Sequence, residues 1–125
     1  MEELWRLSAA QIALGIKERT FSATQVADSV LDRVAEKNSE LNAITVEFPE
    51  QVQAAAVAAD DAVANGRELG PLHGVPVTIK ENIDVAGQAT PNGVPAFADL
   101  MASEDAPLVK NLLDAGAIII GRTNC

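Results

Sequence analysis

The chain has 125 residues, of which 48% are hydrophobic and only 3% are aromatic, and its formal net charge is −9. A single domain suits this length, and the apolar content is too high for intrinsic disorder. The excess of 18 acidic over 9 basic residues argues against binding to nucleic acid or to an anionic membrane surface, since both require clustered positive charge.

The sequence carries no feature of a secreted or membrane-spanning protein. Cys125 is the single cysteine, so no internal disulfide can form. Residues 1–10 lack the basic segment and apolar stretch of a signal peptide, and the longest apolar runs are far too short to span a bilayer. We therefore expect a cytoplasmic location.

Two capping boxes predict helices in the N-terminal half of the chain. In each, a serine caps the backbone and a glutamine three residues later bonds back to it. The box at residues 8–11 precedes a short helix near 9–18. The box at residues 22–25 precedes a longer helix near 23–37, which we expect to end at residues 38–39.

The next segments predict a short extended stretch and a third helix. Residues 41–48 are rich in β-branched side chains, which favour a strand. Pro49 can open the alanine-rich helix at 50–64, and the Asn-Gly pair at 65–66 ends it. We expect these elements to form a helical layer over about residues 1–66.

The second half of the chain predicts a βαβ unit over about residues 70–125. An apolar, β-branched run at 75–80 indicates a strand, and residues 86–104 indicate a long loop of the kind that is often functional. The continuous apolar run at 117–120 is typical of a strand covered on both faces. A helix between two such strands implies that the strands are parallel.

We expect the helix of this unit to begin after Asp105 as its cap, with Pro107 in its first turn. Gly116 lies where a left-handed cap belongs. The apolar positions follow helical spacing and predict the buried face, which consists of Leu108, Val109, Leu112 and Leu113. The chain is therefore expected to be an α/β protein, with N-terminal helices packed on a βαβ unit.

Lys80, at the end of the predicted strand, is the leading candidate for catalysis. Strict alternation places Val75, Val77 and Ile79 on one face and Thr78 and Lys80 on the other. Two interpretations are open: a strand-end lysine whose ammonium reaches water, or a buried lysine that loses its proton and acts as a base. The second requires the neighbouring Glu81 carboxylate to point away, because a nearby anion favours the ammonium form.

Other candidate residues carry weaker signals. His73 lies in a turn without a partnered nucleophile, so a histidine bonded to the backbone is the simpler interpretation. The acidic pairs at 60–61 and 104–105 indicate solvated charge and a helix cap, and Cys125 has no visible activating base. No spacing fits a metal centre or a phosphate-binding glycine loop, so we expect no cofactor.

Residues 71–83, PLHGVPVTIKENI, resemble the lysine motif of the amidase signature family. The similarity continues through GQATPNG at 87–93 and DAPLV at 105–109, and then through DAGAIIIGRTN at 114–124. It is specific from about residue 70 to the end of the chain. The N-terminal helices are compatible with it but less distinctive.

The resemblance implies an amide hydrolase with a Ser–cis-Ser–Lys triad, in which Lys80 matches the lysine and no metal or cofactor is needed. In this family the neutral lysine takes a proton from a bridging serine on a cis peptide bond. That serine deprotonates the nucleophilic serine, which attacks the amide carbonyl, and water hydrolyses the acyl-enzyme. The products are a carboxylic acid and ammonia or an amine.

The family's two serines belong to a Gly/Ser-rich segment that follows the position of Asn124, so no serine of this chain matches either role. The resemblance thus implies that residues 1–125 are the N-terminal portion of one amidase domain and that its α/β/α mixed sheet is incomplete here. We expect the isolated chain to be inactive and to need the rest of the polypeptide. Association of the protein into a homo-oligomer is left open by the sequence.

Two alternatives remain beside an amidase acting on small-molecule amides. One is a glutamine amidotransferase component, because such proteins contain the same lysine motif. The other is a truncated, non-catalytic amidase-like module that pairs with another chain. The choice of amide substrate is not expressed in these residues.

Overall fold

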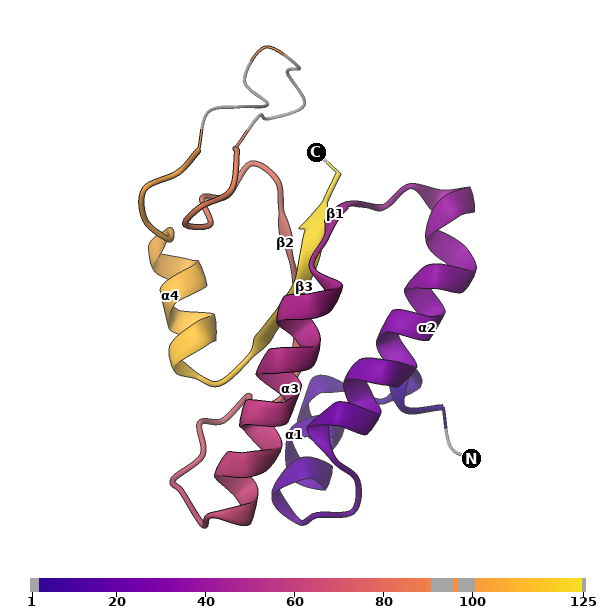
Figure 1. Cartoon of the computed structure of the whole chain (residues 1–125), viewed down its shortest axis with the longest axis vertical. Helices are drawn as coiled ribbons and strands as arrows, with labels where there is room; N and C mark the ends of the chain where they lie inside the picture. The colour runs from indigo at the N-terminus through magenta and orange to yellow at the C-terminus, as the bar shows by residue number, and fades with distance from the viewer. Residues whose placement is uncertain (1–2, 91–95, 97–100, 125) are drawn as a thin grey trace.

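A computed structural model describes residues 3–90, 96 and 101–124 (Figure 1). Helices and strands alternate along the chain, as expected for an α/β protein. In chain order they are the 3-10 turn η1 (Leu4–Arg6), the helices α1 (Ala9–Lys17) and α2 (Ala23–Leu41), the strand β1 (Ile44–Glu47), α3 (Pro49–Ala64), β2 (Pro76–Lys80), α4 (Pro107–Asp114) and β3 (Ile118–Thr123).

The described strands form one small mixed sheet in the order β1-β3-β2. β2 and β3 are parallel neighbours and α4 lies between them in the chain, which confirms the predicted βαβ unit. β1 pairs with the other side of β3 in the antiparallel sense. The continuous apolar segment is thus the central strand, and β2, which ends in Lys80, is at an edge of this sheet.

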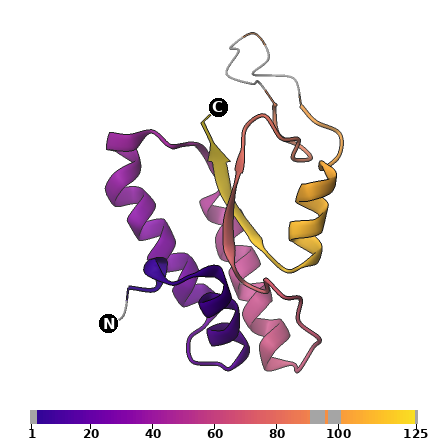
Figure 2. The same ribbon diagram turned by 180° about the vertical axis from the view of Figure 1, so that it is seen from behind.

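Helices cover both faces of the sheet (Figures 1 and 2). A larger apolar cluster joins α1, α2 and α3 to Val75, Ile118 and Ile120, and a smaller one joins α4 to Ile79 and Ile119. Successive isoleucines of β3 therefore enter opposite clusters, which confirms a strand buried on both faces. The N-terminal helices form the layer expected from the sequence.

The alternation predicted for β2 is interrupted in the structure. The register between β2 and β3 shifts between Val77 and Thr78. Val77 packs on the larger cluster with Val75, but Ile79 belongs to the smaller cluster on the α4 side. The prediction that all three share a face is therefore wrong, and the change of cluster coincides with the point where β3 contributes one more residue, Ile120, than β2 to the ladder.

Tertiary contacts also change the predicted end of the second helix. It continues to Leu41, and Asn42, with φ 49°, ends it in the left-handed conformation. Asn38 does not stop the helix. Its side chain instead exchanges two hydrogen bonds with the backbone of Ile44, at 2.8 and 2.9 Å, and so links α2 to the start of β1.

The start of α4 differs from the prediction in the same way. Its N-cap is Ala106, with no side-chain cap, and Pro107 occupies the first turn as expected. The carboxylate of Asp105 accepts a hydrogen bond from the amide of Ala86 at 2.7 Å, so it ties the loop rather than the helix. Only part of the predicted apolar face is covered in this chain: Val109 is fully buried, Leu112 packs on the smaller cluster, and two leucines are largely exposed (Leu108 and Leu113).

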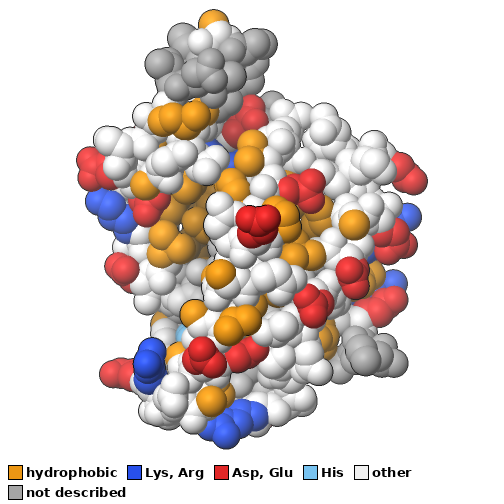
Figure 3. Space-filling model, in the orientation of Figure 1, with side chains coloured by type: hydrophobic (Ala, Val, Ile, Leu, Met, Phe, Trp, Pro, Cys, Tyr) orange, Lys and Arg blue, Asp and Glu red, His pale blue; other side chains and the backbone are white. Residues whose placement is uncertain are grey.

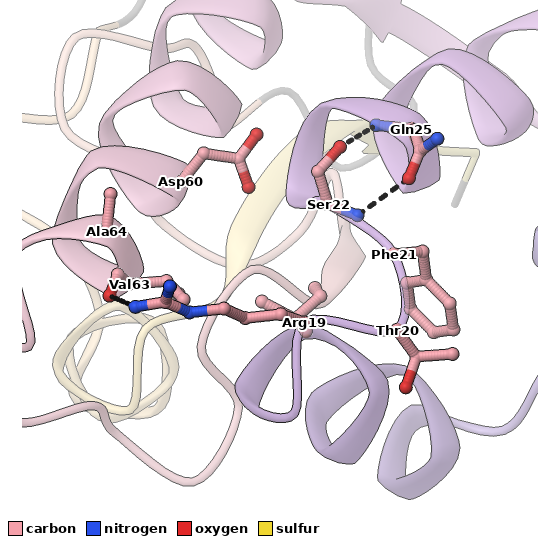
Figure 4. A pocket seen from close by; sticks show the side chains of 9 residues that line it. Arg19, Thr20, Phe21, Ser22, Gln25, Asp60, Val63 and Ala64 are labelled. Carbon is pink, nitrogen blue, oxygen red and sulfur yellow. Dashed lines mark hydrogen bonds between the residues drawn. The ribbon is translucent and has the colours of Figure 1, made fainter.

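The two capping boxes are confirmed, and the second is reinforced by Asp60 of α3 (Figure 4). The Asp60 carboxylate accepts hydrogen bonds from the amides of Ala23 and Thr24, at 2.6 and 3.1 Å, and from the Thr24 hydroxyl at 2.6 Å. A negatively charged carboxylate at this position also interacts favourably with the positive end of the α2 dipole. Asp60 therefore links α3 to the first turn of α2.

Replacing Asp60 by alanine is expected to destabilise the protein by about 1–2 kcal/mol, because two amides and a hydroxyl lose their acceptor. A fall of the melting temperature by several degrees, measured by thermal denaturation, checks this. Asp61→Ala is the matched control, since this exposed carboxylate accepts no hydrogen bond from the described residues. Equal melting temperatures for the two variants would contradict the assignment.

Candidate active site at the carboxyl end of β2

Lys80 is the last residue of β2 and lies opposite Thr123 of β3 in the parallel register. Its side chain is exposed and makes no hydrogen bond or ion pair with the described residues. The burial that a proton-accepting lysine requires is therefore not present in this chain by itself. Its position is nevertheless one where ligand sites occur, because ligands of open α/β sheets bind at the carboxyl ends of parallel strands.

Glu81 follows Lys80 but does not pair with it in the described structure. Its side chain is buried, and its Oε2 accepts a hydrogen bond from the Thr45 hydroxyl of β1 at 3.0 Å. Its amide donates to the carbonyl of Thr123 at 2.9 Å and so extends the ladder by one residue. The carboxylate is thus directed across the sheet towards β1, as the catalytic interpretation of Lys80 requires.

Arg122 of β3 is the polar residue that the sequence analysis did not single out. It is only 1% exposed, although arginine is among the residue types that are rarely buried. Its Nη2 donates to the carbonyls of Glu81 and Ile83, at 3.1 and 2.7 Å, and its Nη1 donates to the carbonyl of Ala89 at 3.1 Å. One signal in the sequence pointed to it: a basic residue inside an otherwise apolar strand.

The pKa of the Arg122 guanidinium reflects its burial. Loss of solvent lowers the pKa of the Arg122 guanidinium from its ordinary value, and the nearby carboxylates of Glu81 and Asp84 act in the opposite direction. Its Nε is buried without a hydrogen-bond partner among the described residues. Arginine keeps its proton at neutral pH, so a fixed positive charge lies behind the turn that follows Lys80.

The base of the predicted long loop is paired. Amides of Gly87 and Ala102 donate to the carbonyls of Ala102 and Gln88, at 3.0 and 2.8 Å, and Ala89 forms a bridge with Met101. Residues 91–95 and 97–100 of the predicted loop lie outside the described residues. At Ala89, the described base of this loop is hydrogen-bonded to the Arg122 guanidinium.

His73 and the acidic pairs are not part of the candidate site around Lys80 and Arg122. The His73 ring is hydrogen-bonded through Nε2 to the carbonyl of Ala59 at 2.8 Å, which confirms the interpretation as a turn histidine. Asp60 and Asp105 accept bonds from backbone amides, as described above. Cys125 lies outside the described residues. The described part of the chain contains no group of three His, Cys, Asp or Glu side chains able to hold a metal ion.

One surface hollow lies among the N-terminal helices, and its charged side chains make hydrogen bonds that support the fold. The hollow in Figure 4 is lined by residues of α1, α2, α3 and the α1–α2 turn. Its charged side chains already make hydrogen bonds within the fold: Arg19 donates to the carbonyl of Val63 at 2.8 Å, and Asp60 caps α2.

None of the described helices is long and apolar enough to cross a membrane.

Comparison with known proteins supports the resemblance seen in the motifs. The amidase family model matches residues 25–125. Indoleacetamide hydrolase from Bradyrhizobium diazoefficiens is 48% identical over 121 residues, which cover 97% of this chain and 23% of that protein. A glutamyl-tRNA(Gln) amidotransferase subunit from Natranaerobius thermophilus is 34% identical, over 98% of this chain and 25% of that protein.

Comparison with solved structures also supports the match to the amidase family. The peptide amidase from Stenotrophomonas maltophilia superposes with a TM-score of 0.85 at 31% identity, over 95% of this chain and 25% of the enzyme. The fold and the residues around Lys80 are those of an amidase-signature segment, and the chain belongs to the amidase family. It spans about a quarter of the length of the relatives it matches.

Proposed function

We propose that Lys80 is the general base of an amide hydrolase and that residues 1–125 are the N-terminal portion of its single catalytic domain. The observation that carries the proposal is the position of Lys80. It ends a parallel strand of an amidase-family sheet, with Glu81 turned away from it and the following turn held by a buried arginine. The exposed end of β2 is where further polypeptide would enclose the lysine.

In the proposed reaction, the neutral Lys80 amine accepts a proton from a bridging serine, which in turn accepts one from the nucleophilic serine. The nucleophile attacks the carbonyl carbon of the amide, the C–N bond breaks, and ammonia or an amine leaves with a proton from the bridging serine, which regains one from the Lys80 ammonium. Water then releases the carboxylic acid. Both serines belong to polypeptide outside residues 1–125, so the triad is assembled only in the complete protein.

A second candidate is a component of a glutamine amidotransferase, and the 34% identity to such a protein supports it. The proposed chemistry at Lys80 is the same up to the release of ammonia. The difference lies in the destination of that ammonia, which an amidotransferase delivers to a partner's reaction. The 48% identity to indoleacetamide hydrolase favours free hydrolysis of a small amide, so we place the hydrolase first.

Labelling with a fluorophosphonate tests the proposal. The complete reading frame is expressed, and the rate of covalent labelling of its serine nucleophile is measured. We expect Lys80→Ala to slow labelling by about 100-fold or more, because a serine without its base is a weak nucleophile. Lys110→Ala is the matched control, since the exposed ammonium of this lysine pairs with Glu104 and with no other carboxylate of the described residues.

Equal labelling rates for wild type and Lys80→Ala would show that Lys80 does not activate the nucleophile.

Ammonia release from indole-3-acetamide and from glutamine separates the two candidate functions, the amide hydrolase and the amidotransferase component. Release from the small amide without any partner protein supports the hydrolase. Release only from glutamine, and only with partner proteins present, supports the amidotransferase.

A further inference from the structure

Arg122 connects the central strand to the turn that follows Lys80. β3 places Arg122 opposite Ile79, next to the Lys80–Thr123 pair. From there the guanidinium donates hydrogen bonds to three carbonyls, two in the turn itself (Glu81 and Ile83) and one at the base of the long loop (Ala89). One planar group thus joins the sheet, the turn and the loop.

The backbone of Lys80 lies inside this arrangement. Its carbonyl accepts a hydrogen bond from the amide of Ile83 at 3.0 Å, and the next amide, of Glu81, donates to Thr123 at 2.9 Å. The Glu81 side chain is in turn held by the Thr45 hydroxyl. The turn is therefore attached to β3 by Arg122 and to β1 by Thr45, and both attachments restrict where the Lys80 side chain begins.

Burying an arginine for stability alone is unfavourable. Removing a guanidinium from water costs free energy, and apolar residues of similar volume often stabilise a core as well or better. The planar fork does what an apolar side chain cannot, because it orients several carbonyls at once with directional bonds. The burial of Arg122 at this point therefore favours a role in fixing geometry.

We propose, on the basis of the proposed function of Lys80, that Arg122 is a positioning residue that orients the Lys80 amine by holding residues 81–89 against the sheet. Arg122 itself touches neither substrate nor reacting atoms. It acts through the turn, and Thr45 supports it through Glu81. Proton transfer is sensitive to such positioning, since displacements of about 1 Å cost on the order of 100-fold in rate.

The test uses the complete protein, with every rate divided by the concentration of active sites titrated with a fluorophosphonate. For Arg122→Met we expect kcat to fall by about 30- to 100-fold, with KM within about threefold of wild type. Arg122→Lys keeps the charge and three donors, so its kcat should fall by less than about tenfold. Arg67→Met, at an exposed arginine, is the matched control with unchanged kcat.

A purely structural role predicts a different result, namely a lower melting temperature with an unchanged kcat per titrated site. That outcome for Arg122→Met would overturn the proposal. If Arg122→Met does not fold, the kcat values of Thr45→Val and Arg122→Lys test the proposal in its place. Loss of the Thr45 hydroxyl at the surface should lower kcat by about two- to fivefold, and wild-type kcat in both variants would overturn the proposal.

The same data separate this inference from the proposed function. If Lys80→Ala retains wild-type turnover, the assignment of Lys80 fails and the role of Arg122 fails with it. If Lys80→Ala is inactive while Arg122→Met turns over at the wild-type rate per site, only the positioning role fails.

Discussion

Lys80→Met is expected to lower kcat of the complete protein by at least about 1,000-fold, the upper part of the range for loss of a general base that also activates a nucleophile. Methionine keeps the length of the side chain and removes the amine. Lys80→Arg is expected to be equally inactive, because a guanidinium does not give up its proton at accessible pH. The two variants together separate a need for a base from a need for positive charge.

Release of ammonia from a panel of small amides, with indole-3-acetamide among them, measures the effect. Lys110→Met controls for the loss of a surface ammonium, and circular dichroism and thermal denaturation control for folding. Substantial activity in Lys80→Arg would show that the charge of Lys80, rather than its basicity, is what the reaction uses. Wild-type activity in Lys80→Met would remove Lys80 from the mechanism altogether.

Residues 1–125 expressed alone are expected to self-associate and to hydrolyse no amide. Both outer strands of the described sheet have a free edge, and free edges pair readily with other chains. Large apolar side chains are also exposed, as Figure 3 shows on both sides of α3. Among the described residues, the large apolar side chains with the highest exposure are Leu41, Met101, Leu14 and Val57.

Size-exclusion chromatography with light scattering checks the association, and ammonia release checks the activity. Co-expression with the remainder of the reading frame is the matched comparison, and it is expected to give a soluble, discrete species that labels with a fluorophosphonate. A monodisperse monomer with cooperative unfolding at dilute concentration would contradict the first part. Hydrolysis by residues 1–125 that disappears in Lys80→Ala would contradict the second.

Local signals in the sequence were sufficient for most of the elements. The two capping boxes begin helices where predicted, because a serine and a glutamine satisfy backbone groups within one turn and need no distant partner. The uninterrupted isoleucines at 118–120 indicate a strand buried on both faces, because no polar side could face water. The motif around Lys80 likewise identified the family before any contact was known.

Features that the sequence could not express depend on partners far away in the chain. Asn38 continues a helix because the backbone of Ile44 satisfies its side chain. Asp105 leaves the helix uncapped because Ala86 comes within its reach. The register shift in the β2–β3 pair, after which Ile79 packs on the α4 side, was likewise not expressed in the sequence, since register is a property of two strands together.

The same distinction applies to the candidate site. The end of an apolar strand left two interpretations of Lys80 open, and the family motif at residues 71–83 made it the candidate base. Arg122 was found only in three dimensions, because its acceptors are backbone carbonyls 33 to 41 residues earlier that carry no mark in the sequence. The sequence determined the elements and the candidate base. The tertiary structure decided which groups bind the turn that follows Lys80, because hydrogen bonds between distant segments exist only once the chain has folded.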